Sequence, residues 1–403
     1  MLPFRAVSRS YFSTQAIKSF AIPNAGPKRK NLIGITYQEL QLELASIPGI
    51  KTYTADQIWS FMYKQVLEKL GYSDFDLMSS IPKHLSAKLK EQFVIDYGEI
   101  KLDKLSTDGT RKFLVGYDTK TNPSHVIESV IIPEPRRSTL CLSSQIGCSL
   151  ACTFCHTGTQ KLQRSLTASE VVGQYMIAAH SQNDFPLDSL QVERKRSLTN
   201  LVFMGQGEPL YNWRNTSKAV SILTHTNGLA IPKPKITIST SGVAPLIPKV
   251  ASDLGVSLAI SLHATRNATR DQIVPLNKTY PIAEVLDACK QYVRLLGKRR
   301  NRITFEYVML RDVNDSVTEA RELVKLLKEL PAHVNLIPWN PWPGSVYETS
   351  PSEQIDRFAA AVMEGNVPCT VRRPRGQDIM AACGQLKSTH DSKRRSSDTT
   401  NFC

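Results

Sequence analysis

The chain has 403 residues, of which 41% are hydrophobic and 21% are charged, with a formal net charge of +14. This composition excludes a disordered, collagenous or coiled-coil protein, and the length is enough for two or three domains with full cores. No charge-free apolar stretch reaches about 18 residues, which excludes a membrane-spanning helix.

The N-terminal segment predicts an organellar address. No Asp or Glu precedes Glu39, whereas Arg and Ser are scattered through the segment, as in mitochondrial and chloroplast transit peptides. We therefore expect residues 1–35 to be a transit peptide or a disordered segment. The mitochondrial matrix is the expected location, with the plastid or the cytoplasm as alternatives. Basic residues at both ends favour a polyanion such as RNA as partner, although a targeting peptide plus a solvated tail explains them equally well.

The next segment predicts a small helical domain. Apolar residues recur at helical spacing over residues 38–47, 54–70 and 77–92, with proline and glycine between these stretches. Strand-like runs follow at 112–117 and 126–132. We assign residues 36–115 to an accessory, RNA-binding domain.

From residue 138 onward, strands and helices alternate. The β-rich runs cover residues 139–142, 201–204, 235–239, 256–261, 303–309, 333–337 and 370–372. The helical stretches cover residues 167–180, 215–225, 244–251, 282–296, 316–329 and 352–363. This alternation predicts an α/β fold with a parallel sheet covered by helices, and the polar residues that follow each strand would lie on the rim that carries active sites. Residues 183–197 read as a surface loop.

Half of the eight cysteines are concentrated in one short segment, which indicates metal or redox chemistry in a reducing compartment. Cys148, Cys152 and Cys155 can wrap one compact, soft metal centre, and no fourth ligand follows closely. Three ligands on a four-iron cluster would leave one iron open. Two alternatives remain: residues 152–156 also match the Cys-x-x-Cys-His signature of c-type haem, and a structural zinc knuckle would suit an RNA-binding protein without catalysis.

The Cys-x3-Cys-x2-Cys spacing, with Phe154 before the last cysteine, resembles the signature of the radical SAM superfamily. Six motifs in the same order narrow the resemblance to the RlmN/Cfr family of RNA methyltransferases, which it matches over residues 36–388. They lie at 141–148, 203–210 (Phe-Met-Gly-Gln-Gly-Glu-Pro-Leu), 239–243, 260–264, 335–341 and 378–386.

This resemblance implies a partial (β/α)6 barrel at residues 134–377 and a C-terminal tail at 378–403. It implies a [4Fe–4S] cluster on the three clustered cysteines, with S-adenosylmethionine on the open iron, cleaved by one electron to a 5′-deoxyadenosyl radical. The implied reaction is methylation of adenosine C2 in the peptidyl-transferase centre of large-subunit rRNA and 3′ to the anticodon in tRNA. The Cfr branch of the family methylates C8 of the same rRNA adenine and is the alternative.

The resemblance also implies residue roles. Cys383 would carry the methyl group, Cys141 would be its disulfide partner and Glu128 the proton acceptor. The cofactor contacts would be Gly207, Glu208, Ser239, Ser261, Leu262, His263 and Asn340. These roles make chemical sense, because a thiolate takes a methyl group from a sulfonium and a second thiolate can release an adduct by forming a disulfide.

The remaining expectations concern partners. The target adenine must be unstacked, so single-stranded or loop RNA is expected, on a monomeric enzyme that does not bind membranes. A flavodoxin- or ferredoxin-type protein would deliver the electron. Cys289 is expected in the core, and Cys369 and Cys403 have no assigned role. The candidate RNA contacts are Lys83, Lys88, Lys90, Lys161, Arg164 and residues 298–302 and 372–375.

Overall fold

The structure is a computed structural model that describes residues 29–65, 75–135, 137–184, 196–297 and 302–388. Most of the predicted transit peptide, most of the predicted loop at 183–197, the basic residues 298–300 and Cys403 lie outside these described residues. None of the helices in the described ranges is both long enough and apolar enough to cross a membrane.

Short helices form the N-terminal region. α1 (Tyr37–Ala45) begins at a capping box in which Thr36 and Glu39 satisfy each other's backbone N–H groups. α2 (Thr54–Ser60) continues into a π-helical turn, Phe61–Gln65. α3 (Lys83–Gln92) begins six residues later than predicted, because Pro82 disfavours helical backbone at the residue before it. β1 (Lys30–Asn31) pairs in parallel with β2 (Phe93–Val94) and closes this region.

One ten-stranded sheet organises the rest of the chain, in the order β14-β13-β12-β11-β10-β9-β6-β5-β4-β3. The parallel strands are β6 (Arg137–Cys141), β9 (Asn200–Phe203), β10 (Ile236–Thr240), β11 (Ser257–Ser261), β12 (Ile303–Met309), β13 (Ala332–Pro338) and β14 (Cys369–Val371). The sheet continues beyond β6 as antiparallel β5 (Val126–Glu134), β4 (Arg111–Gly116) and β3 (Glu99–Leu105).

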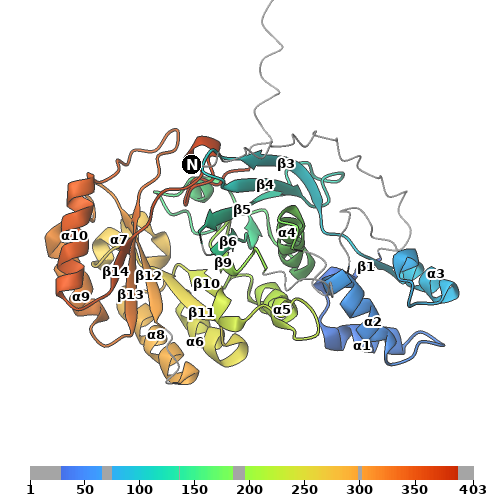
Figure 1. Ribbon diagram of the computed structural model, residues 1–403. Coiled ribbons are helices and arrows are strands. Elements are labelled where there is room, and N and C mark those ends of the chain that lie inside the picture. Colours follow the sequence, from blue (N-terminus) through green and yellow to red (C-terminus); the bar gives the residue numbers. More distant parts are fainter. Residues whose placement is uncertain (1–28, 66–74, 136, 185–195, 298–301, 389–403) are drawn as a thin grey trace, which may run out of the picture.

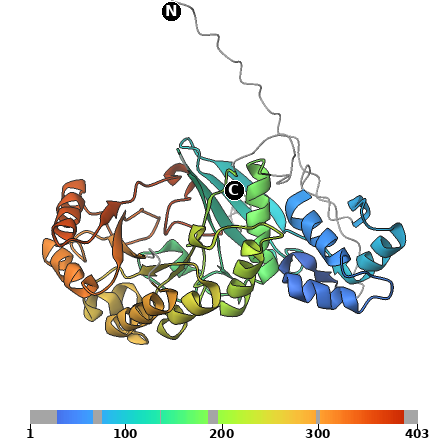
Figure 2. The ribbon, with the colours of Figure 1, turned by 60° about the horizontal axis from the view of Figure 1, so that its bottom comes forward.

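The helices between the parallel strands lie on one side of the curved sheet, as Figures 1 and 2 show. They are α4 (Ala168–Ser181), α5 (Trp213–Thr224), α6 (Ile247–Lys249), α7 (Asn267–Ile273), α8 (Ile282–Leu296), α9 (Val317–Leu327) and α10 (Ser352–Glu364). The first six parallel strands are each followed by helix, and β14 ends the series. The fold is therefore the predicted partial (β/α)6 barrel.

Residues 99–115, which the sequence assigns to the accessory domain, are hydrogen bonded into the same sheet as the barrel strands. The division of the chain into domains remains a prediction. The antiparallel part of the sheet matters for the site because the C-terminal segment, residues 376–388, packs on it. Ala381 and Leu386 form a small apolar cluster there with Val130 and Cys141, and Figure 1 shows this red end of the chain next to the teal strands.

Candidate active site

A cavity opens at the carboxyl ends of the parallel strands, where the barrel rim was expected. Its wall is formed by rim residues, by the loop that carries the three clustered cysteines, and by the C-terminal segment. Of the thirteen predicted site residues, eleven line this cavity: Cys141, Cys148, Cys152, Cys155, Gly207, Glu208, Ser239, Ser261, His263, Asn340 and Cys383. Leu262 and Glu128 do not.

The cysteine loop joins β7 (Gln145–Ile146) to a 3-10 turn, His156–Thr159. The Cys148 N–H donates to the Gln160 carbonyl at 3.1 Å and the Thr153 N–H to the Ile273 carbonyl at 3.2 Å, so both arms of the loop are fixed. The carbonyl of Phe154 accepts from two indole N–H groups, those of Trp339 and Trp342, at 2.9 and 3.0 Å. These contacts hold the loop against the segment that follows β13.

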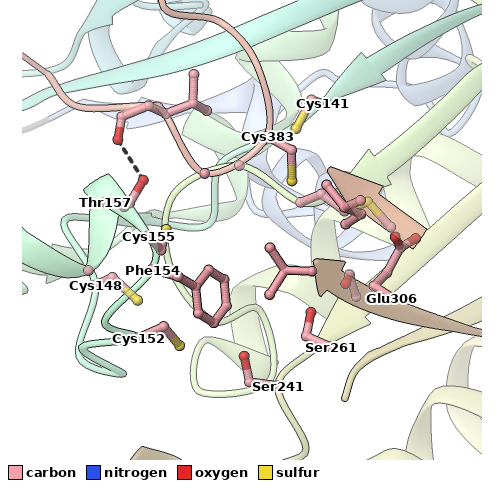
Figure 3. Close-up of a pocket in the computed structure, with 18 of the residues that line it drawn as sticks. Cys141, Cys148, Cys152, Phe154, Cys155, Thr157, Ser241, Ser261, Glu306 and Cys383 are labelled. Atoms are coloured by element: carbon pink, nitrogen blue, oxygen red, sulfur yellow. Dashed lines mark hydrogen bonds between the residues drawn. The ribbon is translucent and has the colours of Figure 1, made fainter. Parts of the chain in front are cut away.

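The thiols of the three loop cysteines point toward the same space (Figure 3). Burial raises the pKa of Cys148 to about 11 and also raises those of Cys152 and Cys155. A soft metal centre would remove these protons on binding, which couples the thiols to a metal. The described residues contain no His, Cys, Asp or Glu trio that could share a single metal ion. A four-iron cluster makes a different demand, because each thiolate binds a different iron.

Glu208 is a buried carboxylate beside the cysteine loop, with 1% of its surface exposed. Its oxygens accept from the backbone N–H groups of Leu210 at 3.0 Å and Ser241 at 2.9 Å, and burial raises its pKa to about 7. Gly207 before it has a φ of +93°, and a Cβ there would lie 2.4 Å from the Cβ of Gln145. Only glycine allows this turn, which brings the carboxylate to the cavity.

His263 and Asn340 stand on the rim with partners already in place. The Nδ1 atom of His263 accepts from the Val308 N–H at 3.1 Å, and burial lowers its pKa to about 3, so the ring is neutral. The Asn340 side chain donates to the Cys383 carbonyl at 3.1 Å and accepts from Gln377 at 3.0 Å. Asn340, predicted as a cofactor contact, therefore binds the C-terminal segment in this structure. Leu262 is fully buried, and its backbone N–H donates to the Glu306 carbonyl at 3.1 Å.

Cys141 and Cys383 meet at one end of the cavity (Figure 3), although 242 positions separate them in the sequence. Both are free thiols. Cys141 is a buried residue, whereas Cys383 is exposed as a residue but its thiol lies in the cavity wall, where it is partly desolvated. Burial raises the pKa of Cys141 to about 12 and also raises that of Cys383, while the guanidinium of Arg372 acts to lower both. The fold therefore brings the two cysteines together beside a cation.

The C-terminal segment is tied directly to the cysteine loop. The His156 N–H donates to the Gly384 carbonyl at 2.8 Å, and the Thr157 hydroxyl donates to the Leu386 carbonyl at 2.6 Å, the dashed line in Figure 3. Cys383 lies just before these contacts, so the position of its thiol depends on that of the loop.

Glu128 lies on β5, outside the cavity wall, with 5% of its surface exposed. It shares a sheet face with Val130 and Ile132, two and four residues further on, which do line the cavity. Lys112 forms an ion pair with its Oε1 atom at 2.9 Å. Burial raises the pKa of Glu128, and Lys112 opposes that rise.

The sequence reasoning missed three charged residues at this site. Glu306, on β12, and Arg372, just after β14, line the cavity, and Lys112 lies buried beside Glu128. Arg372 was considered only as an RNA contact, although its place at the end of the last strand marks it as a rim residue. Arg164, another candidate RNA contact, forms a bidentate ion pair with Glu170, with both N–O distances at 2.7 Å.

Two known protein families match parts of this chain. A family model described as "Radical SAM superfamily" matches residues 142–327, and one described as "Ribosomal RNA large subunit methyltransferase N-terminal domain" matches residues 30–95. The chain is 47% identical over 381 residues to a dual-specificity RNA methyltransferase RlmN of Gluconobacter oxydans, covering 94% of this chain and 90% of the relative. It is 50% identical over 336 residues to the same enzyme of Parvibaculum lavamentivorans, covering 83% and 82%.

A solved structure is similar as well. It is that of a radical SAM methyltransferase from Sphaerobacter thermophilus, with a TM-score of 0.80 and 39% identity, covering 89% of this chain and 99% of the solved chain. The similarity therefore extends over the barrel, the antiparallel part of the sheet and most of the N-terminal region.

Proposed function

The chain belongs to the RlmN family of radical SAM RNA methyltransferases, and from this premise we propose that it methylates adenosine C2 through an S-methylcysteine on Cys383. The proposed substrates are the peptidyl-transferase adenosine of large-subunit rRNA and the adenosine 3′ to the anticodon in tRNA. The observation that carries the proposal is the cavity itself. It brings two free thiols, Cys141 and Cys383, to the same space as the three-cysteine loop.

The family's cofactors are a [4Fe–4S] cluster and S-adenosylmethionine, and the residues present fit them. When bound, these groups supply the methyl group and the radical chemistry that the unreactive C2 carbon requires. The three loop thiols are the soft donors that such a cluster takes. Glu208 is a buried carboxylate and Gly207 allows its approach, which suits a carboxylate that receives the amino group of a bound amino-acid cofactor.

Cys383 is the proposed methyl carrier because its thiol is exposed to the cavity while its backbone is fixed. Arg372 favours the thiolate, the form that accepts a methyl group from a sulfonium. Methylation leaves a thioether. Loss of one hydrogen atom from its methyl carbon, which the radical cofactor would bring about, would let that carbon bond to C2, and the adduct would then give up the C2 proton and one electron, which the cluster would accept. The proton lost from C2 would pass to the carboxylate of Glu128.

Cys141 is the proposed resolving thiol. Its thiolate attacks the Cys383 sulfur, a disulfide bond forms, and the bond from that sulfur to the RNA-bound carbon breaks. The electron pair of the broken bond goes to this carbon, which takes a proton and becomes the methyl group. The disulfide must then be reduced by a thiol donor before the next cycle. Burial raises the pKa of Cys141 to about 12, so its deprotonation is expected to depend on Arg372.

Three further features are part of the proposal. Single-stranded or loop RNA is the expected form of the substrate, because C2 must leave the base stack to enter a cavity. A flavodoxin- or ferredoxin-type protein would supply the electron to a monomeric enzyme. The mitochondrial matrix is the proposed location, supported by the acid-free N-terminal segment.

Covalent trapping tests the division of labour between the two cysteines. Cys383→Ala should give no methylated RNA and no adduct, because the methyl carrier is missing. Cys141→Ala should still join Cys383 to RNA but should not release it, which gives a ribonuclease-sensitive upshift on a denaturing gel. The double variant should trap nothing. Loss of activity in Cys141→Ala without trapped RNA, or trapping in the double variant, would refute the assignment.

The position of the methyl group needs its own measurement. Mass spectrometry of nucleosides from RNA treated with the wild-type protein should show 2-methyladenosine. Detection of 8-methyladenosine instead would place the enzyme with the Cfr branch. Separate digestion of rRNA and tRNA shows which of the two is a substrate.

A further inference from the structure

Lys112 is a buried lysine in the antiparallel part of the sheet, with only 7% of its surface exposed. On β4 it pairs with Val130 of β5, which pairs in turn with Cys141 of β6. Directly opposed residues share a face of the sheet, so these three form a row, and Glu128 lies on the same face two positions from Val130. Buried ammonium groups are rare unless paired, which raises the question of what this one does.

The ammonium of Lys112 has two acceptors from different parts of the chain. Its Nζ lies 2.9 Å from Oε1 of Glu128 and donates to the Met380 carbonyl at 3.0 Å. Met380 has a φ of +53°, which L-residues seldom adopt, so contacts and not local preference fix its carbonyl. Cys383 follows three residues later. One side chain therefore connects the proposed proton acceptor to the segment that carries the proposed methyl carrier.

The two oxygens of Glu128 differ. Oε1 is paired with Lys112, whereas Oε2 is buried and accepts no hydrogen bond of normal geometry from the described residues, although the Lys387 N–H also acts on this carboxylate. An unpaired buried carboxylate oxygen is costly and calls for an explanation, which a donor that arrives with the substrate would supply. The backbone of Glu128 is fixed on both sides, because its N–H donates to Gln206 at 3.0 Å and its carbonyl accepts from Ser143 at 2.6 Å. Of the two carboxylate oxygens, only Oε2 is left to accept from a substrate.

We propose that Lys112 is a positioning residue for RNA methylation: it holds Glu128 ionised with Oε2 free, and it fixes the Cys383 segment to the same sheet through Met380. This inference rests on the proposed function, in which Glu128 accepts the proton from C2. The Lys112 ammonium would thus both favour the ionised form of Glu128 and hold the segment that carries Cys383 in position.

A purely structural ion pair is the competing explanation. Such a pair would affect folding, cluster content and both methyl-transfer steps together. The positioning role predicts a separation of steps, because methylation of Cys383 needs no proton acceptor at C2. It also predicts a change in pH dependence. The groups that act on Glu128 are Lys112, Lys104 of β3 and the Lys387 N–H of the C-terminal segment. Cys141 lies on the neighbouring strand, opposite Val130.

The test uses the purified holoenzyme with Lys112→Gln, which removes the charge but keeps hydrogen-bond donors, and Lys112→Arg, which keeps the charge. Lys101→Gln is the matched control, since Lys101 lies on the adjacent strand in an ion pair with Glu99 away from the cavity. Iron and sulfide content, Cys383 methylation by mass spectrometry, and the rate of RNA methylation against pH are measured for each.

The Lys112→Gln amide can still donate to the Met380 carbonyl, so we expect cluster content and Cys383 methylation within about twofold of wild type. RNA methylation should be slowed by about tenfold or more, because the charge beside Glu128 is lost. Removing the charge lets burial raise the pKa of Glu128 further, so the acidic limb of the rate profile should move to higher pH by on the order of one unit. Lys112→Arg should restore part of the rate and the original limb. Lys101→Gln should match wild type.

Other results would overturn the inference. If Lys112→Gln methylates RNA at the wild-type rate with an unchanged pH profile, Lys112 has no such role. If Lys112→Gln loses Cys383 methylation, RNA methylation and the cluster together, the Lys112–Glu128 pair is structural only. The same holds if Lys112→Gln does not fold while Lys112→Arg behaves as wild type at every pH. If wild type itself forms no 2-methyladenosine, the proposed function fails first, and that outcome is visible without any variant.

Discussion

Asp108 is the residue whose replacement should loosen the C-terminal segment most directly. It lies in the turn between β3 and β4, and its carboxylate accepts from the Gly376 N–H and the Thr110 N–H, each at 2.9 Å. Gly376 has a φ of +63° and begins the turn that leads to Cys383. Asp108→Asn keeps the shape of the side chain but removes its charge, so it mimics the protonated acid.

The expected cost follows from the pKa. Burial alone would raise the pKa of Asp108, but the hydrogen bonds from Thr110, Gly376 and Ser106 outweigh burial and lower it from 3.8 to about 2. A folded-state pKa below the unfolded value means that ionisation stabilises the fold. The difference corresponds to about 2 kcal/mol of the free energy of unfolding. This contribution is complete well above pH 4 and disappears as the pH falls through about 2.

Urea unfolding, followed by the fluorescence of the four tryptophans, measures this cost. Asp108→Asn should be less stable than wild type by about 2 kcal/mol at pH 7, and the two stability curves should converge as the pH falls below 4. Asp103→Asn is the control, because Asp103 forms a half-exposed pair with Arg111 that should contribute about 1 kcal/mol or less. Equal stability of Asp108→Asn and wild type at pH 7, or a difference that does not change with pH, would refute the reasoning.

Three other outcomes are expected. Gly207→Ala should weaken S-adenosylmethionine binding, measured by equilibrium dialysis, because the added Cβ would clash with Gln145. Gly49→Ala is the control, since Gly49 has a similar positive φ but open space around it, and equal binding by both variants would exclude the clash as the cause. Removal of residues 1–30 should leave activity in vitro intact but redirect the protein in cells, and unchanged entry into organelles would contradict the targeting prediction. Iron and sulfide analysis of single Ala variants should show loss of the cluster when Cys148, Cys152 or Cys155 is replaced. The cluster should be retained when Cys141 or Cys383 is replaced, and its loss in a folded Cys383→Ala would overturn this assignment.

Much of the barrel follows from the sequence because its elements are locally encoded. The central parallel strands β10, β11 and β12 are short runs of mostly apolar or β-branched residues, buried along most of their length. α4 and α9 each begin at a capping box that a Ser/Thr-x-x-Glu pattern marks, at Thr167 and Ser316. The rim residues follow from the same alternation, since parallel strands end on one side. Glu208 and His263 lie in the cavity wall for that reason.

The antiparallel part of the sheet carries contacts that the sequence does not encode locally. Lys112 and Glu128 are 16 positions apart and meet because β4 and β5 pair with a register that places Leu114 opposite Glu128. A shift of one residue would turn one of the two to the other face. From sequence alone, each reads as an ordinary solvated charge, and only the register shows that they are a buried pair.

Asn340 illustrates the remaining limit of sequence reasoning. Its motif and its place after β13 indicate a residue at the cavity, and the structure puts it there. What it binds depends on the path of the C-terminal segment, which turns at two left-handed residues, Gly376 and Met380, before reaching Cys383. That path directs the Cys383 carbonyl to the Asn340 amide and the Gln377 amide to its oxygen. These bonds use one N–H and one lone pair of the amide, so a cofactor that bound the remaining N–H would share Asn340 with the segment that carries Cys383.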